Sequence, residues 1–244
     1  HFMIHAFFKA LLFLAAGAVI HVLHHEQDMF KMGGLKNRIP VIYWTFLIGA
    51  ASLAALPFIT AGFYSKDQIL WLAWAGEKGN MWFYLAALIG AFVTAIYTFR
   101  MVFLTFFGTE KTHVRHHAGS LMTTPLIVLA VLSIVGGFIE LPHNLGNVHL
   151  FSDFLSPVLP EVEIRPGVES YEWLMQGIAA LLCLGGIYVA WFFYMKREDL
   201  RAEIKGATYE LNRFWFSGWG FDALYDIVFV TPYVYLSRLI KRDV

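Results

Sequence analysis

Long apolar runs, separated by short polar stretches, divide this chain along its whole length. Five of the runs are long enough to cross the hydrocarbon core of a bilayer, which is about 30 Å thick and takes about 20 helical residues. The run at 40–75 is too long for one simple span, and Pro57 and Gly62, which can each interrupt a helix, lie inside it. We therefore predict five membrane helices, the second of them broken near Pro57–Gly62. The predicted spans are 2–23, 40–75, 81–107, 121–141 and 171–195.

The segments outside these spans have a different character. Residues 142–170 contain four prolines and predict an extramembrane loop, whereas residues 196–213 are polar and charged and predict a linker. Residues 219–244 alternate apolar and charged positions, a pattern typical of an amphipathic helix that lies along an interface or against other helices. We accordingly divide the chain into a core at 1–141, a loop at 142–170, an additional span at 171–195, and a linker with the start of an amphipathic helix at 196–244.

Composition supports the membrane class. Hydrophobic residues make up 58% of the chain and charged residues only 15%, whereas soluble domains are nearer a quarter charged. The predicted fold class is an all-α polytopic membrane protein. The formal net charge of zero gives no argument for a nucleic-acid partner, and the single cysteine, Cys183, excludes a disulfide framework. The chain starts at His1 inside an apolar helical pattern, and we interpret it as part of something longer.

Lysine and arginine are distributed unevenly between the two sides of the predicted membrane domain. Ten of them lie in segments 24–39, 108–120 and 196–213, against Lys78 and Arg165 in the opposite loops. Because cytoplasmic loops of membrane proteins carry an excess of these residues, we place the first three segments on the cytoplasmic side. The five spans alternate consistently with this orientation.

Lys66 is the most informative single residue. It lies eight or nine residues from the end of its apolar run near Trp74, roughly 12 Å deep at the helical rise. A charge at membrane depth costs at least ~2.5–3.5 kcal/mol, so it is rare there and usually functional. Backbone groups freed by a nearby break are tolerated where they line protein or a wet cavity. We predict a proton or ion site at Lys66 with Asp67 as its candidate partner. The alternative is that Lys66 snorkels to a nearby surface.

A second polar group lies on the first span. His1, His5 and Lys9 are spaced at i, i+4 and i+8, so they form one stripe about 12 Å long. Histidine both donates and accepts protons near neutral pH, and lysine removed from water can release its proton, so the stripe is suited to proton relay. The alternative is a set of polar residues hydrogen-bonded between helices. Two histidines four residues apart can also bind a metal, but no nearby carboxylate or thiol completes a ligand set, so we expect no metal site.

A haem protein of the cytochrome b type is the alternative from another class, with His5 and His21 as ligands. Facing histidine pairs on two helices would be needed, and spans 81–107, 121–141 and 171–195 contain no histidine. A purely structural membrane anchor would not need the polar stripe or the buried lysine. The chain contains no nucleotide-binding or hydrolase motif, so we expect neither bond-making chemistry nor a cofactor in it.

Several segments resemble a known family. Residues 1–14 (HFMIHAFFKALLFL) closely resemble a signature helix of the antiporter-like membrane subunits of respiratory complex I, and residues 24–35 (HHEQDMFKMGGL) continue it. Residues 61–67 (AGFYSKD) resemble the second broken helix of that family. Residues 218–226 (GWGFDALYD) resemble the start of the long lateral helix of one member. The resemblance covers essentially the whole chain.

The resemblance implies a fold with two inverted repeats, each with one broken helix, of which this chain contains the second. It implies that Lys9 is the central lysine of a hydrophilic axis, that His1 and His5 form its relay, and that Lys66, beside Asp67, is the lysine of the outward half-channel. It further implies a subunit of a proton-translocating NADH:quinone oxidoreductase in the bacterial inner (cell) membrane, driven by redox chemistry elsewhere in the complex. The implied partners are the other membrane subunits, especially the neighbouring antiporter-like subunit, and the lipid bilayer. The alternative in the same class is the large subunit of a multi-subunit sodium/proton antiporter.

Overall fold

The computed structural model describes residues 1–116, 118–142, 145–146, 148–159 and 163–241. It divides into two compact units, His1–Lys196 and Arg197–Val244, which are described separately below. Most of the described residues are helical, and the two named strands, both in the first unit, have two residues each. This confirms the predicted all-α class.

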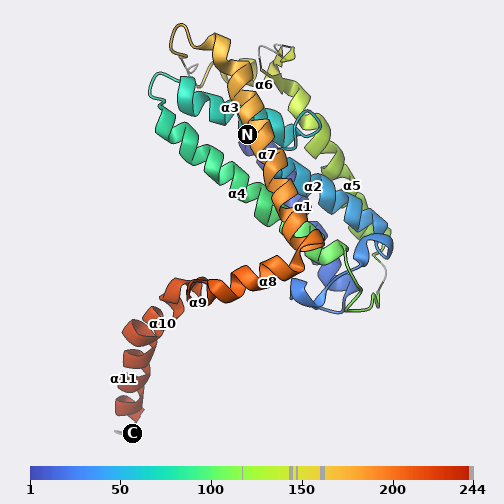
Figure 1. Cartoon of the computed structure of the whole chain (residues 1–244), viewed down its shortest axis with the longest axis vertical. Coiled ribbons are helices and arrows are strands. Elements are labelled where there is room, and N and C mark those ends of the chain that lie inside the picture. The colour runs from blue at the N-terminus through green and yellow to red at the C-terminus, as the bar shows by residue number, and fades with distance from the viewer. Residues whose placement is uncertain (117, 143–144, 147, 160–162, 242–244) are drawn as a thin grey trace. The chain divides into compact units, whose positions relative to one another are not determined.

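The first unit is a helical bundle (Figure 1). Four of its helical segments are long and apolar enough to cross a membrane, namely Phe2–Val22, Met81–Phe106, Ser120–Ile139 and Glu169–Lys196. The predicted second span is divided into two helices of 15 residues each. Helices therefore occupy all five predicted spans, and their outer ends agree with the prediction to within a few residues. The bundle helices are α1 (Phe2–Val22), α2 (Pro40–Ala54), α3 (Ala61–Ala75), α4 (Met81–Phe106), α5 (Ser120–Val135) and α7 (Glu172–Trp191), and α7 continues as a π-helix over Phe192–Lys196.

The predicted break is present, although its bounds differ from the expected ones. Ala55 and Phe58 have φ angles of 65° and 62° between the end of α2 and the start of α3. Pro57 lies within this non-helical stretch, but Gly62 is the second residue of α3. A Cβ atom at position 62 would overlap the carbonyl oxygen of Ser52. Gly62 is therefore needed for the close approach of the two half-helices and not for ending either of them.

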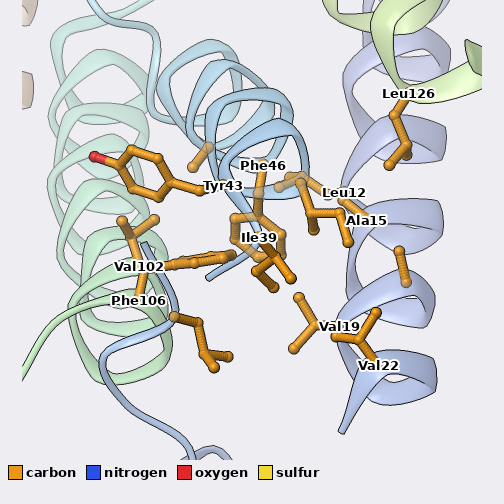
Figure 2. Packing of buried hydrophobic residues seen from close by; sticks show 14 of the residues in the cluster. Leu12, Ala15, Val19, Val22, Ile39, Tyr43, Phe46, Val102, Phe106 and Leu126 are labelled. Carbon is orange, nitrogen blue, oxygen red and sulfur yellow. The ribbon is translucent and has the colours of Figure 1, made fainter. Parts of the chain in front are cut away.

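The largest buried cluster joins α1, α2, α4 and α5. Figure 2 shows Leu12, Ala15, Val19 and Val22 of α1 on one side and Tyr43, Phe46, Val102 and Phe106 on the other. The α1 residues recur at three- and four-residue intervals, so they form one stripe. The rings of Phe46 and Phe106 are 5.2 Å apart between centroids. Since lipid tails are as apolar as these side chains, close van der Waals packing and small residues such as Ala15 hold the helices together.

The loops gather into two groups at opposite ends of the helices. At the end assigned to the cytoplasm, the backbone N–H of Gly34 donates to the carbonyl of Phe107 at 3.0 Å, so loop 24–39 lies against the end of α4. At the other end, the N–H of Arg165 donates to the carbonyl of Ala75 at 3.0 Å. The alternation of the helices thus agrees with the orientation expected from the charges.

The segment expected as a plain loop contains short elements. Strand β1 (Glu140–Leu141) pairs antiparallel with β2 (Val148–His149), and α6 (Leu150–Leu155) follows. The Glu140 carboxylate accepts hydrogen bonds from the backbone N–H of Ser152 at 3.1 Å and from its hydroxyl at 2.7 Å. These contacts join residues twelve positions apart, so local sequence pattern gave no sign of them.

The described residues of the second unit are mainly helical, and this includes the stretch 196–213 that we expected as a linker. Helices α8 (Glu198–Ala207) and α9 (Tyr209–Phe216) occupy most of that stretch, with Lys205 in the last turn of α8, where a cation is favourable. Positive φ angles at Gly218, Trp219 and Gly220 end α9. Helices α10 (Phe221–Tyr225) and α11 (Thr231–Lys241) follow, joined by a π-helix. The stretch Gly218–Lys241 is also long and apolar enough to cross a membrane, so its expected amphipathic placement stays a prediction.

Candidate functional site

The break between α2 and α3 leaves backbone carbonyls at the end of α2 without helical partners. Side chains from two other places supply donors to them. The Nζ atom of Lys66 lies 3.5 Å from the carbonyl oxygen of Leu53, and the thiol of Cys183 donates to the carbonyl of Ala54 at 3.1 Å. Lys66 and Cys183 are also close enough to interact electrostatically. The predicted charged residue and the predicted break therefore form one site, which α7 completes.

A network of hydroxyl groups braces the same break. The backbone N–H of Gly62 donates to the Ser52 hydroxyl at 3.2 Å, and that hydroxyl donates to the carbonyl of Ser133 on α5 at 3.4 Å. The hydroxyl of Tyr64 donates to the carbonyl of Phe58 at 3.0 Å. Since buried unpaired backbone groups are costly, these contacts are what allows irregular backbone at this depth.

Asp67 points to a different neighbour from Lys66. Its carboxyl is buried, with 4% of the residue exposed, and is hydrogen-bonded by the side chain of Gln176, which is equally buried. It also interacts electrostatically with Glu172 at the start of α7 and with Tyr84 of α4. Among the ion pairs between described residues, none joins Lys66 to Asp67. The expected partnership of the two residues stays a prediction, since they face α2 and α7 respectively.

A cavity of about 920 Å³ lies next to Asp67. Its walls come from α3, from the start of α7 and from the outward loop. Five carboxyl side chains line it, and Asp67 is the buried member of the set. The others are Glu140, Asp153, Glu169 and Glu172. The cavity therefore places a string of proton-accepting groups between the buried Asp67 and the loop.

The polar stripe of α1 approaches this site through His1. Its Nδ1 atom lies 3.0 Å from the Ser65 hydroxyl, within hydrogen-bond distance, and Ser65 immediately precedes Lys66. The rings of His1 and His5 are 5.9 Å apart between centroids. His5 and Lys9 are half-buried, and within the described part of the chain Lys9 makes no hydrogen bond or ion pair. The structure thus brings His1, and not Lys9, to the neighbourhood of Lys66.

The haem arrangement considered for His5 and His21 is not favoured by their positions. Sixteen residues of one helix separate them, which is about 24 Å at the helical rise. The ring of His21 stacks on that of His116 at 5.6 Å, at the opposite end of α1 from His5. No group of three or more histidine, cysteine, aspartate or glutamate side chains among the described residues has the geometry of a metal site.

Sequence reasoning missed the residues that α7 contributes. Glu172, Gln176 and Cys183 are spaced at i, i+4 and i+11, which places them on one face of the helix. Gln176 is a polar residue within an apolar stretch of this span, and this was the feature of the sequence that could have marked it as part of a site. Which residues this face would meet could not be inferred from the spacing.

The fold and the site together define a class of protein. The chain has a broken apolar helix with a half-buried lysine and a buried aspartate just after the break. Its residues 1–96 match the family described as NADH:quinone oxidoreductase/Mrp antiporter, TM. Over these residues the chain is similar to that family, and its long apolar helices mark it as a multi-pass membrane protein.

The relatives are more specific. The chain is 46% identical over 245 residues to NADH-quinone oxidoreductase subunit L of Pseudomonas aeruginosa and 43% identical over 244 residues to the subunit L of Escherichia coli, in each case along all of this chain. It is 36% identical over 256 residues to NADH-ubiquinone oxidoreductase chain 5 of Cryptococcus neoformans, along 99% of this chain. The chain spans 38% of the length of each of these relatives. These similarities confirm the resemblance to the antiporter-like subunits of complex I.

Proposed function

We propose that this chain is part of a proton-translocating membrane subunit of an NADH:quinone oxidoreductase, and that Lys66 releases protons toward the outer side. The single observation that carries the proposal is the position of Lys66, whose ammonium lies against the freed carbonyl of Leu53 at the break between α2 and α3. A charge held in such a place can respond to a change in the field, because the surroundings screen it weakly.

The α1 stripe supplies the inward part of the proposed route. Lys9 would pass a proton to His5 and then to His1, and the Ser65 hydroxyl within 3.0 Å of His1 would carry it to the neighbourhood of Lys66. Each histidine takes up a proton on one ring nitrogen and releases one from the other, so it ends in its starting state after the ring or its tautomer resets. Lys66 takes up the proton as ammonium and returns to the amine on release. Asp67 is the proposed acceptor on the outward side.

The subunit would act in a larger assembly. The relatives are named as parts of NADH-quinone oxidoreductases, which supports partnership with other membrane subunits of complex I, with a neighbouring antiporter-like subunit beside this chain. The distribution of lysine and arginine supports an orientation with loops 24–39 and 108–120 toward the cytoplasm, and the bacterial relatives support a bacterial cell membrane. Oxidation of NADH and reduction of quinone would take place elsewhere in the assembly and change the charges along the route. The sodium/proton antiporter shares the matched family, but the names of the relatives favour the complex I subunit.

Lys66→Ala in the complete membrane-bound complex tests this proposal. Loss of a positioned proton-transfer group costs about 10²-fold or more in the rate of the step it serves, so NADH-driven proton uptake and coupled quinone reduction should both fall. Reduction of an artificial electron acceptor by NADH reports whether the redox part is intact. Lys78→Ala, an exposed lysine in the loop between α3 and α4, is the matched control and should pump normally. Wild-type pumping stoichiometry in the Lys66→Ala complex would contradict the proposed role of Lys66.

A further inference from the structure

Helix α7 presents one polar face to the site of Lys66 and Asp67. Glu172 is its first residue, Gln176 lies one turn farther along, and Cys183 lies about 10 Å beyond Gln176 at the helical rise. Gln176 and Cys183 are each 4% exposed. Buried polar groups are expected to be hydrogen-bonded, and both of these have partners around the break, in the Asp67 carboxyl and the Ala54 carbonyl. The face thus follows α3 from its deep end to the cavity.

Among the carboxyl groups that line the cavity, Glu172 is the one placed to continue from Asp67. The two side chains interact electrostatically, so they are near neighbours. The Glu140 carboxylate instead accepts a hydrogen bond from the Ser152 hydroxyl, and it lies 3.4 Å from the Nδ1 atom of His149. Glu169 is exposed near the start of α7. The order inward from the loop is therefore Glu172, then Asp67 with Gln176, then Lys66.

Gln176 has a different role from that of Glu172. An amide side chain does not exchange a proton readily near neutral pH, but its N–H groups can hold a carboxyl in one orientation. Because Asp67 and Gln176 are equally buried, their hydrogen bond is shielded from water and fixes the Asp67 carboxyl at the wall of the cavity. Gln176 is thus a positioning residue.

We propose that protons leave Lys66 through Asp67 and Glu172 into the acidic cavity, with Gln176 of α7 holding Asp67 in place. This rests on the proposed function of the chain and names its outward exit. In each step one O–H or N–H bond breaks and one O–H bond forms. The Lys66 ammonium becomes an amine as the Asp67 carboxylate becomes a carboxylic acid, which then passes its proton to the Glu172 carboxylate. Glu172 releases the proton to the cavity, and no oxidant or other reactant is needed.

Two matched substitutions test the carboxyl step. Glu172→Gln removes a proton carrier and keeps the shape of the side chain, whereas Glu163→Gln makes the same change at an exposed residue of the outward loop that does not line the cavity. We expect NADH-driven proton uptake by membranes with the complete complex to fall about tenfold or more in Glu172→Gln, short of the full ~10²-fold effect of losing such a group because water in a polar cavity can bypass it. Glu163→Gln should pump normally. Equal pumping in the two variants would overturn the step.

The positioning role of Gln176 needs a variant that restores the donor. Gln176→Leu keeps the volume and removes the hydrogen bond, so pumping should fall severalfold while reduction of an artificial acceptor by NADH is unchanged. Gln176→His returns an N–H donor of similar reach, and we expect it to recover part of the loss. If the leucine and histidine variants lost the same amount, the role of Gln176 would be only structural and the inference would be wrong on this point.

The outcome at Lys66 separates this inference from the proposed function. Low pumping in Lys66→Ala together with normal pumping in Glu172→Gln overturns the exit route and leaves the proposed function standing. Normal pumping in both variants overturns the proposed function. Low pumping in both, with a normal Glu163→Gln control, supports the route.

Discussion

Two regions of this chain face the same problem of irregular backbone and solve it in different ways. At the break between α2 and α3, the freed carbonyls of Leu53 and Ala54 accept from Lys66 and from the buried Cys183. In the paired loops at the cytoplasmic end of the bundle, Lys111 donates to the carbonyl of Phe30 at 3.1 Å and Thr112 donates to that of Lys31 at 2.8 Å, but these hydrogen bonds are exposed to solvent.

The two regions differ in whether water can replace a side-chain donor that is lost. A backbone carbonyl at the loop end can turn to water when its side-chain partner is removed, so little is lost. A carbonyl at the break is shielded, and an unpaired polar group there costs about 1–3 kcal/mol. Each region has two such side-chain hydrogen bonds. They hold the break rigid, whereas water can take their place in the loop pair. Three substitutions test this contrast, and we describe them from the largest expected effect to the smallest.

Gly62→Ala should have the largest effect on stability. The new Cβ would overlap the Ser52 carbonyl, and overpacking against backbone costs about 1–3 kcal/mol or more, which outweighs the gain of about 1 kcal/mol from the higher helix propensity of alanine. The thermal denaturation midpoint of the purified complex and the amount of assembled chain in membranes both measure it.

The same change at Gly177 of α7 is the control for Gly62, since nothing lies within 4 Å of a Cβ built there. Gly177→Ala should be neutral or slightly stabilising. Equal stability of the two alanine variants would mean that the close crossing at Ser52 does not constrain the break.

Cys183→Ala should have an intermediate effect. It removes the donor to the Ala54 carbonyl and leaves a buried acceptor unpaired, so we expect a loss of about 1–3 kcal/mol in the free energy of unfolding. Cys183→Ser keeps a hydroxyl donor at the same place and should lose less. Thermal denaturation of the two variants side by side gives the comparison, and a serine variant less stable than the alanine variant would contradict it.

Glu110→Gln in the loop pair should have the smallest effect, and the effect should depend on pH. A hydrogen bond with His113, at 2.9 Å, and a weaker contribution from Arg38 hold the pKa of the Glu110 carboxyl below its usual range. A lowered pKa means that the contribution is fully present above the usual carboxyl pKa and is lost as the pH falls through the lowered value. Protease cleavage within residues 24–39 should therefore become faster at acid pH in the wild-type chain.

The variant Glu110→Gln should show that faster cleavage already at neutral pH, and high salt should produce a similar change because exposed ion pairs are screened. Glu77→Gln, an exposed residue at the opposite end of the bundle, is the control and should leave the cleavage of 24–39 unaltered. A large loss of stability in Glu110→Gln would break the contrast between the two regions.

The sequence by itself determined the apolar spans, the presence of a break and the position of a charged lysine, Lys66, close to that break. These are local properties, because about 20 apolar residues, a proline and a buried charge each have their effect wherever the chain goes next. Helix formation over 196–213 was missed although it is also local, since a polar composition was interpreted as a linker when its lysine and acidic residues suit an exposed helix.

Only the tertiary structure decided which groups meet. It assigned Gly62 to a helix crossing, brought His1 to Ser65, and turned Asp67 toward Gln176 of α7, more than a hundred residues away along the chain. Periodicity gives the face on which a residue lies but not the helix that covers this face, because that depends on how all the helices pack at once. For this reason the lysine of the site was found in the sequence, whereas the neighbours that complete the site were found only in the fold.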